Sequence, residues 1–149
     1  ECGHVNMPVR TEEDFRLTRF VEALLAADGE VPHAGVEEVL AGRGLANLYA
    51  FAASEAGQRA RPTSADVLKA LEAGDPLASH AARLYIHILG QMLADLALIH
   101  LPYGGIYMIG GMSRAMLPHF QHFGLEAAFR EPRRVDLLQT DFSVTVVED

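Results

Sequence analysis

The sequence predicts a helix-rich α/β fold with an incomplete sheet. Half of the 149 residues are apolar, which is enough to build the core of about one domain. Apolar side chains recur at helical spacing along most of the chain, whereas only residues 106–109 and 143–147 have the pattern of a strand. Two short strands make a poor sheet by themselves. We therefore expect their neighbours to come from other residues of a longer polypeptide or from a partner chain.

The first predicted helix lies between Thr11 and Gly29. Thr11 suits the N-cap, and the acidic residues 12–14 complement the positive end of the helix dipole. Apolar residues recur at helical spacing from Leu17 to Leu25, and Gly29 fits the position just beyond the C-terminus.

Three shorter helices are expected next. Residues 34–56 are helical in pattern but are interrupted by Gly42-Arg43-Gly44, which indicates a turn between two helices. Another helix begins at Thr63 or Ser64 and stops at Gly74.

The longest predicted helix begins at Asp75-Pro76, an N-cap followed by a proline at the first helical position. Its apolar positions form a wide stripe from Leu77 to Leu96, and Pro102 ends it. Burial of each large apolar side chain contributes about 1.5–3 kcal/mol, so this helix should be the spine of the core. Polar residues interrupt its most apolar stretch, residues 84–101, which is shorter than the ~20 residues of a membrane span.

The remaining residues predict two strands and one helix. A turn at residues 103–105 leads into the apolar run 106–109, which is typical of a strand buried on both faces. Gly110-Gly111 ends that strand, and Ser113 is expected to cap a helix that reaches about Phe123.

Composition excludes several classes of protein. The chain has 20 acidic and 12 basic residues and a formal charge of -8, which disfavours nucleic-acid binding. Its single cysteine, Cys2, excludes an intrachain disulfide framework and a cysteine-rich zinc site. The seven histidines form no HExxH motif, so we expect no bound metal. Without a basic and apolar leader, we expect a soluble cytoplasmic protein.

The first candidate site is the turn Glu1-Cys2-Gly3-His4. Gly3 allows a tight backbone, so that Glu1 and His4 could point into one cleft. A hydrogen-bond acceptor beside a donor suits a polyhydroxylated ligand, because each sugar hydroxyl needs both. The alternative is a frayed terminus with a solvated glutamate.

The second candidate site is the pair Glu37 and Glu38. Adjacent residues of a helix leave its axis about 100° apart, so one carboxylate could face a cleft while the other faces water. The alternative is two solvated charges on one helix face.

The third candidate site is Gly110-Gly111. Neither residue has a Cβ, so a flat ring or a ribose could pack against the backbone, and the helix expected from Ser113 would favour a phosphate. The pair is neither a GxGxxG fingerprint nor a Walker loop, and a glycine pair after a strand is common.

Several of these segments, in this order, resemble the bacterial glucokinase family, the hexose kinases of the actin-like ATPase superfamily. The segments that carry the resemblance are ECGHV at 1–5, EVLAGRGLANLY at 38–49, ADLAL at 94–98, GGIYMIGG at 104–111 and GLEAAF at 124–129. Cys2 departs from the family pattern, which has glycine there.

The resemblance implies an actin-like (ribonuclease H-like) ATPase domain and phosphorylation of glucose at its 6-hydroxyl, a step of glycolysis, by Mg²⁺-ATP. Glu1 and His4 fall on the family's sugar-binding glutamate and histidine, and Glu37 falls on its second sugar-binding glutamate. Gly110 and Gly111 fall on the glycines of its adenosine motif. No catalytic residue is carried over, because the family's phosphate loops and catalytic aspartate precede the Glu-x-Gly-His turn.

We therefore expect residues 1–149 to be a fragment of a glucokinase C-terminal domain, without the N-terminal lobe and the terminal helix. The intact protein should be a glucokinase and a homodimer, and the fragment alone should be inactive. The alternatives are a non-catalytic sugar-binding or regulatory module and a structural or dimerisation domain.

Overall fold

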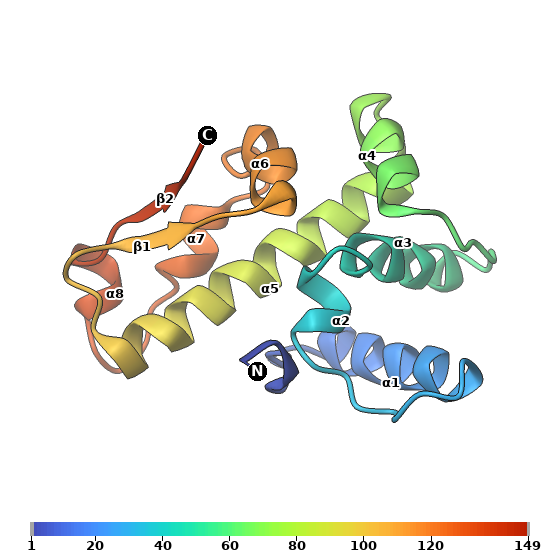
Figure 1. Ribbon diagram of the computed structural model, residues 1–149, viewed down its shortest axis with the longest axis horizontal. Coiled ribbons are helices and arrows are strands. Elements are labelled where there is room, and N and C mark those ends of the chain that lie inside the picture. The colour runs from blue at the N-terminus through green and yellow to red at the C-terminus, as the bar shows by residue number, and fades with distance from the viewer. Residues whose placement is uncertain (1, 149) are drawn as a thin grey trace. The chain divides into compact units, whose positions relative to one another are not determined.

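The computed structural model describes residues 2–148, except for the side chain of Gln139. The chain divides into two compact units, Glu1–Tyr85 (unit 1) and Ile86–Asp149 (unit 2), and the boundary falls within the long helix α5 (Pro76–His100). The architecture is mostly helical, as the sequence predicts, and the two strands pair in parallel to form a small sheet (Figure 1).

Unit 1 consists of short and medium helices, most of which begin at the expected residues. The helix expected from about residue 34 begins instead at Glu37 and is only four residues long. Thr11 and Thr63 both form capping boxes. In each, the threonine side chain accepts a hydrogen bond from the backbone N–H of an aspartate three residues later, and the carboxylate of that aspartate accepts one from the backbone N–H of the threonine. Thr63 rather than Ser64 is thus the N-cap of its helix. Besides the first part of α5, the elements are η1 (Cys2–His4), α1 (Glu12–Ala27), α2 (Glu37–Leu40), α3 (Gly44–Glu55) and α4 (Ser64–Glu72).

The core of unit 1 lies among α1, α2, α3 and α5. Phe20 of α1 and Phe51 of α3 meet edge to face, with ring centroids 5.6 Å apart. The side chains that fill the core share near-complete burial and come from these four helices: Leu17, Val21, Val39, Leu45, Leu48 and Leu84.

An isolated antiparallel bridge between Asn6 and Gly35 joins the N-terminal segment to the residues before α2. Two backbone hydrogen bonds flank it, from Met7 N–H to Ala34 O (3.3 Å) and from Val36 N–H to Val5 O (2.9 Å). The bridge places η1 beside the beginning of α2, although the two segments are about thirty residues apart in the sequence.

Glu13 links α1 to α5 within unit 1. Its carboxylate accepts hydrogen bonds from His80 Nε2 (2.8 Å) and from the Arg83 guanidinium (3.2 Å). Burial acts to raise the pKa of Glu13, but the hydrogen bonds from His80 and Arg83 outweigh it, so the pKa lies below its ordinary value of 4.5.

Unit 2 contains both predicted strands, each shorter than predicted, paired in parallel with Ile106 opposite Val144 and Met108 opposite Val146. The expectation that the first strand is buried on both faces is wrong, because Tyr107 is exposed. The two strands lie side by side in Figure 1. Besides the last part of α5, the elements are β1 (Ile106–Met108), α6 (Gly111–Met116), η2 (Leu117–His119), α7 (Leu125–Phe129), α8 (Leu137–Thr140) and β2 (Val144–Val146).

The helix expected from Ser113 to about Phe123 is wrong at both ends. It begins at Gly111, with Gly110 as its N-cap, and gives way at Leu117 to the 3₁₀ turn η2. Pro118 explains the early end, because proline lacks a backbone N–H and its ring clashes with the preceding helical turn.

Close packing and one arginine organise unit 2. A Cβ at Gly90 of α5 would lie 2.5 Å from the Cβ of Ala128, so only glycine lets α7 approach α5 this closely. Arg130 donates hydrogen bonds to the carbonyls of Leu138 (2.7 Å), Asp141 (3.0 Å) and Phe142 (3.2 Å). These bonds tie α7 to the segment that leads into β2.

Helix α5 is long and apolar enough to cross a membrane by length and composition, and 56% of its most apolar window is buried inside the protein. Gln91, one of the polar residues in its most apolar stretch, is buried and donates a hydrogen bond to Glu131. A buried, hydrogen-bonded glutamine is typical of a core helix.

Gly44→Ala should destabilise the chain by about 3 kcal/mol, because overpacking forces the backbone to shift. A Cβ at residue 44 would lie 2.3 Å from the carbonyl carbon of Val39. The free energy of unfolding in urea measures the loss. Gly42→Ala is the matched control, since nothing lies within 4 Å of its added Cβ. Equal stabilities of the two variants would contradict this account.

Glu13→Gln should cost about 0.5–1 kcal/mol near neutral pH, since a partly exposed ion pair contributes only modestly. The folded pKa of Glu13 is lowered, so its contribution is present above pH 4.5 and is lost as the pH falls through the folded value. Urea unfolding of both proteins from pH 7 downward should show their stabilities converging below pH 4.5. A difference that persists at low pH would refute the assignment.

Candidate functional site

Two of the predicted ligand-binding side chains meet in unit 1. The Nε2 atom of His4, on η1, lies 3.7 Å from an Oε atom of Glu37, on α2. Both side chains are open to solvent, with exposed fractions of 64% and 46%. The third predicted residue, Glu1, lies outside the described residues. The bridge between Asn6 and Gly35 is what brings His4 and Glu37 together.

Gly3 packs the turn directly against Glu37. A Cβ at residue 3 would lie 3.4 Å from a carboxylate oxygen of Glu37 and 3.5 Å from its Cβ. The neighbouring residue Cys2 is exposed and has a free thiol. The small residue at position 3 therefore leaves the Glu37 carboxylate and His4 on one accessible surface.

The adjacent glutamates have different environments. Glu37 is exposed, whereas Glu38 is buried, so the alternative of two solvated charges is wrong. The Glu38 carboxylate accepts a hydrogen bond from the backbone N–H of Gly35 (3.0 Å) and pairs with the guanidinium of Arg43 (3.2 Å). A buried carboxylate needs such partners to offset its desolvation.

Two side chains from neighbouring helices hold the short helix α2. Asn47 of α3 donates a hydrogen bond to the carbonyl of Glu38 (2.8 Å), and the Tyr85 hydroxyl of α5 donates one to the carbonyl of Leu40 (3.1 Å). Burial raises the pKa of Tyr85 to about 12. A helix of four residues cannot hold its own position, so these contacts fix the helix that carries Glu37.

Gly110 and Gly111 form an open stretch of backbone after β1 in unit 2. Gly110 has φ +110°, which favours glycine, and it is the N-cap of α6. A Cβ at either position would meet nothing within 4 Å, and both residues are exposed. The expected Ser113 cap is wrong, because the helix begins two residues earlier.

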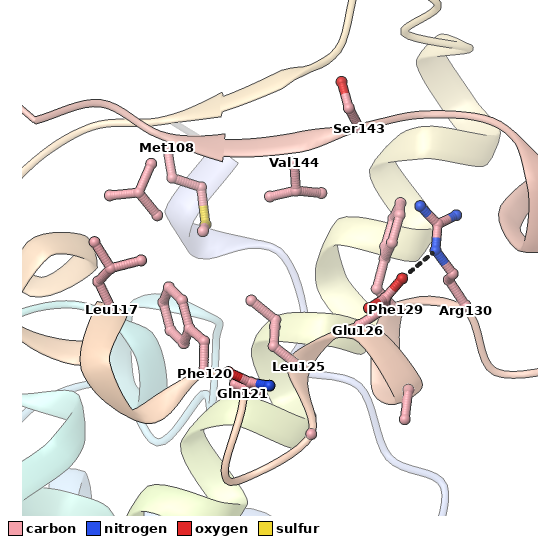
Figure 2. Close-up of a pocket in the computed structure, with 13 residues that line it drawn as sticks. Met108, Leu117, Phe120, Gln121, Leu125, Glu126, Phe129, Arg130, Ser143 and Val144 are labelled. Carbon is pink, nitrogen blue, oxygen red and sulfur yellow. Dashed lines mark hydrogen bonds and ion pairs between the residues drawn. The ribbon is translucent and has the colours of Figure 1, made fainter.

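A hollow of about 870 Å³ in unit 2 lies under the two strands, and the side chains of Met108, Phe120 and Leu125 surround it (Figure 2). The ion pair between Glu126 and Arg130, at 3.3 Å, lies on its lining. Gly110 and Gly111 are not among the lining residues. Most of the residues that line the hollow are apolar. The hollow is therefore a different site from Gly110 and Gly111.

Among residues 2–148, no group of three or more histidine, cysteine or acidic side chains could hold a metal ion. His119 and His122, which lie three residues apart, each have their ring beside the ring of Phe123.

Sequence reasoning missed the residues that hold Glu38 and the short helix α2 in place. Arg43 and Asn47 belong to segments read only as a turn and a helix, and neither has a sequence spacing that predicts contact with Glu38. One signal was present in the sequence. Glu38 lies three residues after Gly35, and in a capping box the acidic side chain that accepts the N-cap N–H lies at the same spacing, so this spacing could have predicted the hydrogen bond from Gly35 to Glu38.

The glucokinase family model matches residues 1–149. The chain therefore belongs to the glucokinase family. Among curated relatives, the glucokinase of Sinorhizobium fredii is 35% identical over 133 residues, covering 88% of this chain and 38% of that protein. The glucokinase of Brucella suis is 31% identical over 149 residues, covering 99% of this chain and 42% of its own.

Solved structures share the fold. A glucokinase from an Antarctic psychrotroph has a TM-score of 0.87 and 23% identity, covering the whole of this chain and 45% of its own. The Balamuthia mandrillaris glucokinase, solved in complex with glucose, has a TM-score of 0.75 and 19% identity, covering 97% of this chain and 42% of its own. This chain spans about two fifths of the length of the curated relatives it matches.

Tyr85→Phe should cost about 1 kcal/mol, because the carbonyl of Leu40 loses its hydrogen-bond donor. Because burial disfavours the charged tyrosinate and raises the pKa of Tyr85, the folded state should lose stability as the pH rises from 10 to about 12. Urea unfolding measures the first effect. A spectrophotometric titration measures the second, since the variant should lack the tyrosine that ionises at about pH 12. An unchanged titration curve would contradict this environment for Tyr85.

Proposed function

We propose that this chain forms part of the hexose site of a glucokinase, within an actin-like ATPase domain, and that the full-length protein phosphorylates glucose with ATP. Membership of the glucokinase family supports the reaction class. The single observation that carries the assignment to residues is the approach of His4 and Glu37 to 3.7 Å on an accessible surface.

The two side chains supply complementary hydrogen-bonding groups. The Glu37 carboxylate accepts protons from sugar hydroxyls, and the His4 imidazole can donate to a hydroxyl oxygen. A hydrogen bond to a charged group contributes about 1.5–3 kcal/mol, so one carboxylate accounts for a large share of hexose affinity. We assign Glu1 as a further hexose ligand on the resemblance of the Glu-Cys-Gly-His turn to the family motif.

We assign Gly110 and Gly111 to the adenosine of ATP. The open space above both Cα atoms supports this role, because a ring or ribose can lie against a backbone that has no Cβ. Mg²⁺ would neutralise charge on the transferring phosphoryl group, but we assign no residue of this chain to it. The described residues offer no cluster of three suitable ligands.

Phosphoryl transfer also needs a cradle for the phosphates and an acceptor for the hydroxyl proton. No described residue is assigned to either task. We therefore propose that these 149 residues, a fragment of the C-terminal domain, do not phosphorylate glucose by themselves. We place the full-length enzyme in the cytoplasm as a homodimer, and the exposed Tyr107 and Ile109 of unit 2 are consistent with further packing partners.

Calorimetric titration of the gene's full-length product with glucose tests the assignment. Glu37→Gln and His4→Ala should each weaken glucose binding by about tenfold or more, since each removes one side-chain partner of the sugar. Glu55→Gln is the matched control: it also removes a carboxylate that pairs with a basic side chain, Arg16, at 2.6 Å. It should leave glucose affinity unchanged.

A coupled assay for glucose 6-phosphate separates the alternatives. Binding with ATP-dependent turnover supports the kinase, and binding without turnover identifies a sugar-binding module instead. Absence of glucose binding by the full-length protein would refute the proposal. Turnover by the isolated 149-residue chain would refute its inactivity.

A further inference from the structure

Glu38 is a buried, charged side chain that the proposed hexose site does not use. It is 6% exposed and follows Glu37 on the short helix α2. Burial of a carboxylate is costly unless it is paired and hydrogen-bonded, so its position calls for a reason. The groups that bind the Glu38 carboxylate explain why it is buried.

The Glu38 carboxylate contacts the segment that meets the His4 turn. It accepts the N–H of Gly35 at 3.0 Å, and Gly35 is the residue that bridges to Asn6. A Cβ at Gly35 would lie 3.0 Å from this carboxylate, 3.2 Å from the carbonyl oxygen of Val5 and 3.3 Å from that of Gly3. Gly35 is therefore enclosed between the carboxylate and the backbone on either side of His4.

Arg43 holds the carboxylate from the other side. Its guanidinium lies 3.2 Å from Glu38 and 3.1 Å from Glu30, so it is fixed between two carboxylates. Asn47 meanwhile binds the backbone carbonyl of Glu38 at 2.8 Å. Both the backbone and the side chain of this residue are thus fixed, while the Glu37 carboxylate beside it is left open to solvent.

We propose that Glu38, held by Arg43, is the positioning residue of the hexose site: it fixes the turn that bears His4 against the helix that bears Glu37, and it does not touch the sugar. This inference rests on the proposed function. A site whose groups are held in place before the ligand arrives does not lose binding energy to ordering them. Loss of Glu38 should therefore weaken hexose binding although all three proposed ligands, Glu1, His4 and Glu37, remain.

Steady-state kinetics of the full-length product test the proposal. Glu38→Ala should raise the KM for glucose at least fivefold, with the KM for ATP within twofold of wild type. Glu38→Gln should recover most of the loss, because its amide oxygen still accepts the Gly35 N–H. A merely structural role would lower the fraction of active enzyme without separating the two KM values.

Glu55→Gln is again the matched control, with both KM values expected to be unchanged. Amide hydrogen exchange followed by mass spectrometry adds a readout that needs no activity: peptides containing residues 34–36 should exchange faster in Glu38→Ala. If that variant does not fold, Arg43→Leu decides, and a rise in the glucose KM of threefold or more supports the proposal.

Two failures are distinguishable. If the wild-type protein does not bind glucose, the proposed function falls, and the hexose role of Glu38 falls with it. If the wild type is active and Glu38→Ala leaves the glucose KM unchanged, or raises both KM values alike, only the positioning role is overturned. An unchanged glucose KM in Arg43→Leu overturns it in the same way.

Discussion

The candidate site depends on one short backbone contact, the bridge between Asn6 and Gly35. The turn that carries His4 has no buried residue, and α2, which carries Glu37, is only four residues long. Neither element could hold a side chain in place alone, because short helices are marginal without tertiary support. The bridge and its flanking hydrogen bonds hold the two elements against each other, so that each supports the other.

The neighbouring glutamates show how one short helix serves two purposes. Because adjacent side chains leave a helix about 100° apart, α2 can direct Glu38 into the protein and Glu37 out of it. The inward carboxylate is stabilised by Arg43 and by the N–H of Gly35. The outward one remains available to a ligand, so rigidity and accessibility come from consecutive residues.

In unit 2, a glycine and an arginine hold the elements that surround the two strands. Gly90 allows α7 to lie against α5, and Arg130 binds the carbonyls before β2. These contacts hold the parallel pair of strands, and the exposed glycines 110 and 111 follow directly after β1. The glucokinase family model covers the residues of both units.

The sequence by itself determined the helix-rich architecture, the presence of two short strands, the Thr11 cap and the pattern that resembles glucokinases, because periodicity and capping depend on neighbouring residues. It left Thr63 and Ser64 as alternative caps of one helix, and the structure selects Thr63. The sequence also offered His4, in the Glu-Cys-Gly-His turn, and the pair Glu37 and Glu38 as candidates, and the family resemblance then selected His4 and Glu37 as expected sugar-binding residues. Only the tertiary structure decided that Glu37 is open while Glu38 is buried, and that Pro118 ends α6 early. The bridge between Asn6 and Gly35 and the pairing of Glu38 with Arg43, five residues away, follow no helical or strand period, so only the folded chain reveals them.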